Sequence, residues 1–505
     1  MSSANLFSLF SDNFPAQADA VFLDGIDGRQ LRYGELNQRT GQMLSLMKKL
    51  SIKKGDRVVV QVEKSIEAVL LYLGCLRAGV IYIPLNTAYT SNEVNFFLGD
   101  ASPQLFVCMP NRLDELKSVA QRQGVPELLT LGAAGDGELM AAVSSMPECE
   151  DIANIATDDL AAILYTSGTT GRSKGAMLSH GNLAANARVL FAYWHWQNND
   201  VLLHALPIYH VHGLFVALHC ALLGASRVIF MPRFEVSTVL QKLPESTVMM
   251  GVPTFYTRLL DDAGFNRSIC SNMRLFISGS APLLAETHRD FEARTGHRIL
   301  ERYGMTETGM ITSNPYDGER IAGTVGYPLP GINARVADND GRELPRGESG
   351  VLEIAGPNVF QGYWQMPDKT AEEFRADGWF ITGDIAVMDD DGRVTIVGRA
   401  KDLIISGGFN VYPKEVESEI DALPGVKESA VIGVPHPDFG EGVTAIVVAD
   451  DSTEINEQII FDALRDRLAR FKQPKQIFIV DELPRNTMGK VQKNILRKSY
   501  RDIFK

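Results

Sequence analysis

The feature that most constrains the fold of this chain is an alternation of short apolar runs with longer amphipathic segments over most of its length. The apolar runs are DRVVVQV (56–62), QLFVCM (104–109), LAAILYTSG (160–168), SRVIFMP (226–232), STVMMGVP (246–253) and MRLFISGS (273–280). Each run has the length of a strand, whereas segments such as 65–79 and 283–296 carry apolar residues at helical spacing. This alternation predicts an α/β fold with largely parallel sheets.

The composition of the sequence changes from about residue 330. Glycine, proline and aspartate become frequent, and the apolar runs between them are brief, which indicates antiparallel hairpins. The turn DDDGR (389–393) is followed by GRAKD (398–402), where we expect a domain boundary. Because 505 residues exceed what one core holds, we predict a larger domain over 1–400 and a smaller one, mixing strands and helices, over 401–505.

Charge and cysteine content restrict the partners and the compartment. The net charge is −13, which argues against nucleic acid or an anionic membrane as the main partner. An anionic substrate would therefore need a local cationic pocket. The five cysteines are scattered and form no C-x-x-C pair, and the N-terminus lacks the pattern of a signal peptide. We therefore expect a cytoplasmic protein with free thiols and no metal–cysteine site.

The stretch YTSGTTGRSKGA (165–176) has the composition of a phosphate-binding loop. It follows an apolar strand, and its glycines allow backbone N–H groups to converge on an anion, while its hydroxyls and Lys174 add donors. It does not match the Walker A pattern G-x-x-x-x-G-K-[ST]. A flexible surface loop rich in small residues is the alternative interpretation.

Further motifs follow in chain order. They are LPIYHVHG (206–213), SGSAPL (278–283), ERYGMTETG (301–309), ITGDI (381–385), GRAKD (398–402) and LPRNTMGKVQK (483–493). Glu307 offers a hard oxygen ligand for Mg²⁺, and Tyr303 offers a ring that can stack on adenine. Asp384 can accept hydrogen bonds from vicinal hydroxyls, as acidic residues do in dinucleotide folds. Taken singly, each has an ordinary structural alternative, such as a solvated carboxylate or a turn residue.

In this order and spacing the motifs resemble those of the adenylate-forming acyl-CoA synthetases, although Ser173 stands where that family more often has proline. The resemblance implies an α/β fold with a large N-terminal domain of two parallel-sheet subdomains plus a β-barrel-like subdomain, and a small mobile α+β C-terminal domain. It also implies two half-reactions at one site. A carboxylate attacks the α-phosphorus of ATP with Mg²⁺ present, pyrophosphate leaves, and coenzyme A then displaces AMP.

The resemblance also assigns roles to residues. It implies Lys490, Thr306 and His210 as catalytic residues, Lys401 as the hinge, and Glu307 and Thr169 as Mg²⁺ ligands. The residues implied to bind ATP or coenzyme A are Thr166, Ser167, Gly168, Thr169, Thr170, Gly171, Lys174, Ser278, Gly279, Ser280, Ala281, Glu301, Arg302, Tyr303, Gly304, Met305, Thr306, Asp384, Arg399, Lys401, Gly407 and Gly408.

Two arginines bear on the carboxylic acid that is activated. Arg258 and Arg302 fall inside or beside acyl-pocket motifs, and a buried guanidinium needs an acidic partner. A small dicarboxylate would supply one, with its second carboxylate held by arginine. Arginines paired within the protein, with Asp261 or Glu301 for example, are the alternative.

Segments such as LPIYHVHGLFVA, MGVPTFYTRLL and ERYGMTETGM are similar to the malonate–CoA ligases within this superfamily. That likeness implies malonate as the substrate, methylmalonate as a slower one, and an acyl pocket formed by His210, Val211, Met310 and the arginines. Three alternatives stay open: ligation of a small monocarboxylate or medium-chain fatty acid, adenylate binding without turnover, and loading of a carrier protein. We also expect Lys490 to be a target for a lysine acyltransferase and a deacylase, since acylation would remove its charge.

Overall fold

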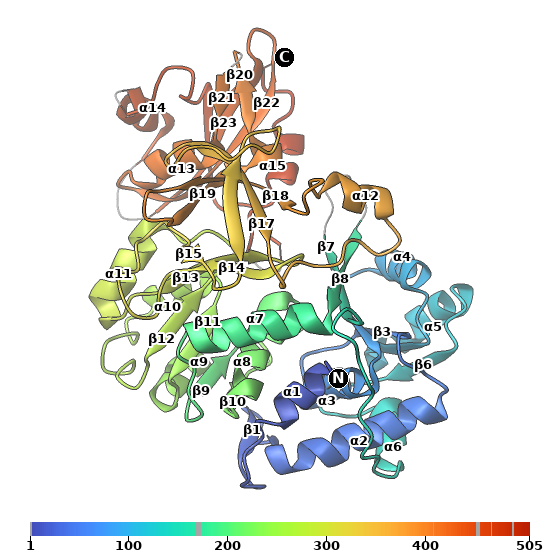
Figure 1. Cartoon of the computed structure of the whole chain (residues 1–505). Coiled ribbons are helices and arrows are strands. Elements are labelled where there is room, and N and C mark those ends of the chain that lie inside the picture. The colour runs from blue at the N-terminus through green and yellow to red at the C-terminus, as the bar shows by residue number, and fades with distance from the viewer. Residues whose placement is uncertain are drawn as a thin grey trace.

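The computed structural model describes residues 3–166, 173–407, 409–450, 455–465, 467–486 and 489–504. Figure 1 shows a large N-terminal domain with a small C-terminal domain above it. This is the mixed α/β architecture that the sequence predicts.

The first sheet of the large domain has the strand order β6-β5-β3-β4-β7-β8. Its strands are β3 (Arg57–Gln61), β4 (Ile81–Pro84), β5 (Leu105–Cys108), β6 (Glu127–Thr130), β7 (Leu160–Thr166) and β8 (Lys174–Ser179). All neighbours are parallel except β7 and β8, which form an antiparallel pair on either side of the predicted phosphate loop. The helices of this region are α2 (Tyr33–Lys49), α3 (Ile66–Ala78), α4 (Ser91–Ala101), η1 (Pro110–Arg112), α5 (Leu113–Arg122) and α6 (Glu138–Ser144).

The second sheet has the order β15-β14-β13-β12-β11-β9-β10-β1-β2, parallel from β13 to β1 and antiparallel at both ends. Its strands are β1 (Val21–Gly25), β2 (Gln30–Arg32), β9 (Val201–His204), β10 (Arg227–Phe230), β11 (Val248–Gly251), β12 (Leu275–Ser278), β13 (Leu300–Met305), β14 (Gly309–Ser313) and β15 (Tyr327–Pro328). The helices are α1 (Leu6–Ser11), α7 (His180–Tyr193), the π-helical turn η2 (His212–Ala217), α8 (Leu218–Leu223), α9 (Val236–Lys242), η3 (Leu243–Glu245), α10 (Pro253–Leu260) and α11 (Ala285–Thr295). The strands predicted at 226–232, 246–253 and 273–280 are confirmed.

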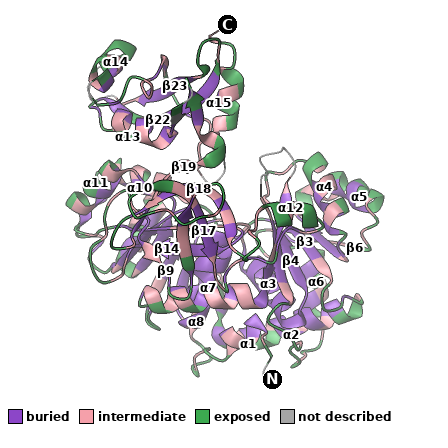
Figure 2. Ribbon diagram, turned by 45° about the horizontal axis from the view of Figure 1, so that its top comes forward, coloured by how far each residue is buried: buried purple, intermediate pink, exposed green. Residues whose placement is uncertain are grey.

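Helix α3 is the most apolar segment of the chain, and all of its residues are buried in the interior of the large domain (Figure 2). Its one guanidinium, that of Arg77, stays inside because it donates to the carbonyl oxygens of Asn37, Cys149 and Asp151. Such full pairing offsets the cost of burying the charge. Among the described residues, none of the helices combines the length and the apolarity needed to cross a bilayer.

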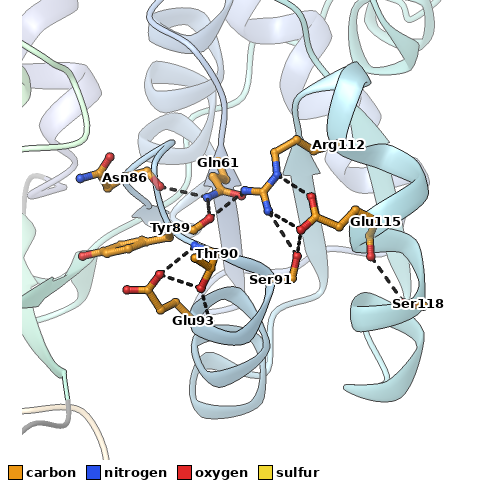
Figure 3. A network of polar contacts seen from close by, with 9 residues as sticks. All are labelled: Gln61, Asn86, Tyr89, Thr90, Ser91, Glu93, Arg112, Glu115 and Ser118. Carbon is orange, nitrogen blue, oxygen red and sulfur yellow. Dashed lines mark hydrogen bonds and ion pairs between the residues drawn. The ribbon is translucent and has the colours of Figure 1, made fainter.

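A polar network lies at the carboxyl ends of β3 and β5 in the first sheet (Figure 3). The guanidinium of Arg112 donates to Gln61 Oε1 at 3.0 Å and to Tyr89 O at 2.8 Å, and it forms an ion pair with Glu115. Gln61 Nε2 in turn donates to the carbonyl oxygens of Asn86 and Tyr89. These bonds hold the loop between β4 and α4 against the sheet.

The β-rich part of the large domain is a four-stranded antiparallel sheet with the order β16-β17-β18-β19. Its elements are β16 (Asn333–Ala337), β17 (Ser349–Ala355), the helix α12 (Pro367–Glu372), β18 (Phe380–Met388), β19 (Val394–Arg399) and the short turn η4 (Ala400–Asp402). The antiparallel hairpins predicted after residue 330 are therefore confirmed. The predicted barrel-like subdomain takes the form of this sheet, with β16 and β19 at its two ends.

The C-terminal domain packs three helices around a small sheet. Its elements are β20 (Ile404–Ser406), β21 (Phe409–Val411), α13 (Pro413–Asp421), β22 (Val426–His436), β23 (Gly440–Ala449), α14 (Glu457–Arg465), β24 (Gln476–Val480) and α15 (Lys493–Ser499). Both faces of the sheet are apolar. Val431 belongs to one core cluster and its neighbours Ala430 and Ile432 to another, as strand alternation requires. The domain therefore has a core of its own.

Candidate active site

The segment LPIYHVHG connects β9 to the π-helical turn η2, a rare conformation that is frequent at functional sites. The backbone N–H of His212 donates to Nδ1 of His210 at 3.3 Å. Burial, with the positive charges of Arg302 and Lys490 nearby, lowers the pKa of His210 to about 4. His210 is therefore neutral at pH 7, with its Nε2 atom carrying the proton.

Arg302 lies on β13 and is buried, with 3% of its surface exposed. Its Nε and Nη2 atoms have no hydrogen-bond partner, and burial lowers its pKa to about 9. The guanidinium lies directly against Gly279, where any Cβ would clash with it. The neighbouring Glu301 does not pair with it: Glu301 Oε1 accepts from the backbone N–H of Leu283, and Glu301 Oε2 has no hydrogen-bond partner. Arg302 is thus a buried cation whose donors are free to bind an anion.

A second buried donor, which the sequence analysis did not single out, lies next to Arg302. His212 Nδ1 is 3.3 Å from Ser280 Oγ, and its Nε2 atom has no partner. Ser280, which follows Gly279, has φ of 71°. Burial and the nearby Arg302 hold the pKa of His212 well below its usual range. The HVH motif alone could not identify this residue, because the backbone of the π-helical turn decides which imidazole faces Arg302.

The residues predicted to flank the acyl group are closely packed. Val211 and Thr306, together with residues of α7 such as Asn186, line a cavity of about 10 Å³, which is about one water molecule in size. Met310 is buried, and a Cβ placed on Gly304 would lie 2.7 Å from its terminal methyl group. The pocket residues predicted on either side of the acyl group are therefore packed rather than open.

The substrate role predicted for Arg258 stays a prediction, but the structure distinguishes this residue from Arg302. This residue lies in the last turn of α10 and is exposed, whereas Arg302 is buried. The apolar face of α10 places Tyr256 and Leu259 in the core, and Arg258 falls on its solvent side. Arg302 is consequently the arginine suited to an acyl pocket.

The residues predicted to bind the ribose lie together. Asp384 on β18 and Arg399 on β19 are direct partners in the antiparallel ladder, and Arg399 Nε is 2.9 Å from Asp384 Oδ1. The hydroxyl of Tyr303 donates to the other oxygen of Asp384. The negative charge of Asp384 raises the pKa of Arg399. This arrangement fixes the carboxylate beside Tyr303 on β13.

The segment predicted to contact adenine follows β12. Ser278 is buried at the end of that strand, and its Oγ atom has no partner in the described structure. Glu301 is buried too, which raises its pKa to about 8. Ala281, Gly304, Met305 and Thr306 are half-buried. These residues lie at the carboxyl ends of adjacent parallel strands, where α/β sheets bind ligands.

Lys490 reaches this site from the C-terminal domain. The adjacent Gly489 lies against Thr254 of the large domain, since a Cβ on it would be 3.1 Å from Thr254 Oγ1. The pKa of Lys490 is lowered to about 8, first by burial and then by the positive charge of Arg399. Its charge also contributes to the low pKa of His210. The structure thus brings the predicted catalytic lysine next to the residues that are predicted to bind the ribose and the acyl group.

The rate of adenylation is expected to fall as pH rises through about 8, because Lys490 must carry a proton to neutralise developing negative charge. Pyrophosphate release measured over pH 6 to 10 would show this decline. In Lys490→Arg the decline should move to higher pH, since arginine stays protonated. The same decline in both proteins would assign it to another group.

The phosphate side of the site is only partly described. Ser167, Gly168, Thr169, Thr170 and Gly171 lie outside the described residues, whereas Thr166 ends β7 and Lys174 begins β8. Lys174 Nζ is 2.8 Å from Glu373 Oε1 and lies over the ring of Tyr363. The hydroxyl oxygen of Tyr363 lies 3.0 Å from Glu307 Oε1. Lys174 and Glu307 therefore lie close together, on either side of a shared contact with Tyr363.

The Glu307 carboxylate near Lys174 is suited to bind a Mg²⁺ ion that arrives with ATP. Burial raises the pKa of Glu307, and a cation would favour its ionised form. In the described part of the chain, no group of three or more histidine, cysteine or acidic side chains could hold a metal. A single carboxylate supplemented by phosphate oxygens is the usual arrangement for Mg²⁺. The predicted second ligand, Thr169, lies outside the described residues.

Glu307→Gln is expected to raise the Mg²⁺ concentration needed for half-maximal pyrophosphate release by about tenfold, because the amide binds the ion less strongly. The measurement is a Mg²⁺ titration at fixed ATP. An unchanged midpoint would remove Glu307 from the ligand set.

The remaining predicted residues lie in the C-terminal part. Lys401 is exposed in the turn η4, directly after β19. Gly407 has φ of 60° in the turn between β20 and β21, and its N–H donates to Phe439 O at 2.9 Å. Gly408 lies outside the described residues.

Comparisons with known proteins agree with this geometry. Residues 10–364 match the model of the AMP-binding enzyme family, and residues 415–490 match its C-terminal domain. The malonate–CoA ligase of Arabidopsis thaliana is 34% identical, covering 98% of this chain and 89% of that protein. A feruloyl-CoA synthase of an Amycolatopsis species is also 34% identical, covering 94% of each chain.

Among solved structures, ATP-bound MatB from Rhodopseudomonas palustris is 54% identical, covers 100% of both chains and superposes with a TM-score of 0.97. Its apo form superposes with a TM-score of 0.87. These matches extend over the whole length of the chain. They agree with the order of the motifs and with the way their side chains lie together in the structure. The chain belongs to the AMP-binding enzyme family.

Proposed function

We propose that this enzyme ligates malonate to coenzyme A in two steps through malonyl-adenylate, with ATP converted to AMP and pyrophosphate. The choice of malonate as the substrate rests on Arg302, whose buried guanidinium has two nitrogen atoms without a hydrogen-bond partner. An unpaired buried charge costs several kcal/mol. A dicarboxylic acid would remove that cost with the carboxylate that does not react.

The site residues suggest how one malonate would be held. Arg302 and His212 would bind its distal carboxylate, with Ser280 orienting His212 through the contact at Nδ1. The proximal carboxylate would then lie toward Thr306, His210 and Lys490, where attack on the α-phosphorus occurs. Lys490 would stabilise the negative charge that develops on the carboxylate and the phosphate.

A monocarboxylate substrate is the alternative, because ligases for other acids, including feruloyl-CoA synthase, are as similar in sequence as the malonate–CoA ligase of Arabidopsis thaliana, at 34% identity. One feature favours a small diacid instead: a monocarboxylate would leave the guanidinium of Arg302 unpaired. Methylmalonate would be a slower substrate, since an added methyl group meets the packed Val211 and Met310.

The two half-reactions require two arrangements of the domains. In the present arrangement Lys490 is in the site, and the closer match is to an ATP-bound form, which supports assigning it to adenylation. We place the boundary between residues 400 and 401, with Lys401 as the hinge. Rotation there would withdraw Lys490 and bring Gly407 and Gly408 toward the adenylate to line a path for coenzyme A.

The proposal includes a cytoplasmic location, supported by five free cysteines, four of them buried. It also includes control by acylation of Lys490. A pKa lowered to about 8 gives this lysine a larger neutral, nucleophilic fraction at pH 7 than an ordinary lysine has. A lysine acyltransferase and a deacylase would be the partners.

Product analysis tests the proposal. The purified protein with malonate, ATP, Mg²⁺ and coenzyme A should form malonyl-CoA, AMP and pyrophosphate in equal amounts, identified by mass spectrometry and chromatography. ADP with phosphate as products, or no thioester, would contradict it.

A further inference from the structure

Lys174, the lysine of the phosphate loop, already has an anionic partner in this structure. Its Nζ atom is 2.8 Å from Glu373 Oε1, and both side chains are largely shielded, with 11% and 21% of their surfaces exposed. The same Nζ atom lies 4.0 Å from the centre of the Tyr363 ring. A carboxylate is therefore the anionic partner of Lys174 in this structure.

Glu373 reaches this position because the chain before α12 runs antiparallel beside the first residues of β8. Glu373 directly follows α12, which Figure 1 shows next to β7 and β8. The backbone of the segment before α12 is tied to β8: Trp364 N donates to Gly175 O, and Met177 N donates to Gly362 O. These backbone bonds hold the chain before α12 beside the start of β8, where Lys174 lies.

Glu373 also has partners that do not depend on Lys174. Its Oε2 atom accepts from the Tyr363 hydroxyl at 2.5 Å, and Lys369, one helical turn earlier, is 3.2 Å from its Oε1 atom. Burial opposes ionisation of Glu373, yet hydrogen bonds from Lys174 and Tyr363 keep its pKa below the usual value. Glu373 can therefore remain charged and paired when Lys174 leaves it.

We propose that Glu373 is a competing anion that exchanges with the β- and γ-phosphates for Lys174. When ATP binds, Lys174 turns to the phosphates and Glu373 keeps Lys369 and Tyr363. When the α-phosphorus has reacted, Glu373 recovers Lys174 and so favours the departure of pyrophosphate. The exchange makes and breaks only ion pairs, and it weakens the binding of ATP and pyrophosphate together. It rests on ATP-dependent adenylation and does not depend on the identity of the acid.

Glu373→Gln is the test, because glutamine keeps the size and an acceptor for Tyr363 while removing the charge. Calorimetry on the full-length protein with Mg²⁺, without any carboxylic acid, should show about fivefold tighter binding of both ATP and pyrophosphate. Glu372→Gln is the matched control, since Glu372 pairs with Lys369 at 2.9 Å and is exposed. Its affinities should equal those of the wild type.

A double-mutant cycle separates exchange at Lys174 from a general change in charge. In a Lys174→Met background, Glu373→Gln should no longer tighten either ligand. Unchanged or weaker binding in Glu373→Gln would overturn the proposal, and so would equal tightening with and without Lys174. Failure of the protein to use malonate would leave these affinities unaffected, so the two proposals fail separately.

Discussion

Lys490→Ala is expected to lower the adenylation rate by at least about 10²–10³-fold, the loss typical of removing one transition-state donor. The same variant should retain most of its thioesterification activity. The reason is geometric: Lys490 is near Arg399 and His210 only while the C-terminal domain lies as it does in this structure. Coenzyme A transfer requires the other arrangement.

Two assays separate the half-reactions. Adenylation is followed as pyrophosphate release from malonate and ATP, and thioesterification as malonyl-CoA formation from supplied malonyl-adenylate. Lys493→Ala is a suitable control, because Lys493 belongs to the same segment but pairs with Glu417 inside the C-terminal domain. Equal loss of both half-reactions in Lys490→Ala would contradict the role given to Lys490.

Arg302→Ala is expected to reduce kcat/KM for malonate by about 10²-fold or more, because the distal carboxylate would lose its buried charged partner. Use of acetate or butyrate should stay the same or rise. The Mg·ATP affinity should change little. Steady-state kinetics with each acid at saturating ATP give these values, and thermal unfolding shows whether the variant is folded.

Arg258→Ala is the matched control for Arg302→Ala. The sequence places both arginines near acyl-pocket motifs, but Arg258 is exposed in the structure. Its removal should therefore leave the preference for malonate over acetate intact. A uniform loss of activity with all acids in Arg302→Ala, or a selective loss in Arg258→Ala, would reverse the assignment.

The sequence predicted the sheets well because local patterns decide them. Runs such as 56–62 and 246–253 are apolar, short and bounded by turn residues, and both became buried parallel strands. The observed strands begin and end one or two residues away from the predicted limits, because the ends of a strand depend on its hydrogen-bonded neighbours in the sheet. The barrel-like subdomain that the resemblance implies is an open four-stranded sheet in the structure, because its end strands β16 and β19 do not pair with each other.

The individual site residues were harder to predict, since burial and long-range contacts select them. Arg258 and Arg302 look alike in the sequence, and only the packing of α10 and β13 separates them. His212 became a candidate because its Nε2 atom is buried without a partner. Glu373 meets Lys174 across 199 residues of sequence, so no local motif indicates the pair.

Pyrophosphate release across malonate, acetate, octanoate and 4-coumarate tests the central claim most directly. The purified wild-type enzyme, with ATP and Mg²⁺ and without coenzyme A, should give a kcat/KM for malonate at least about a hundredfold above those for the monocarboxylates. An equal or higher value with any monocarboxylate would contradict the assignment of Arg302 to a second carboxylate, and with it the identification of malonate as the substrate.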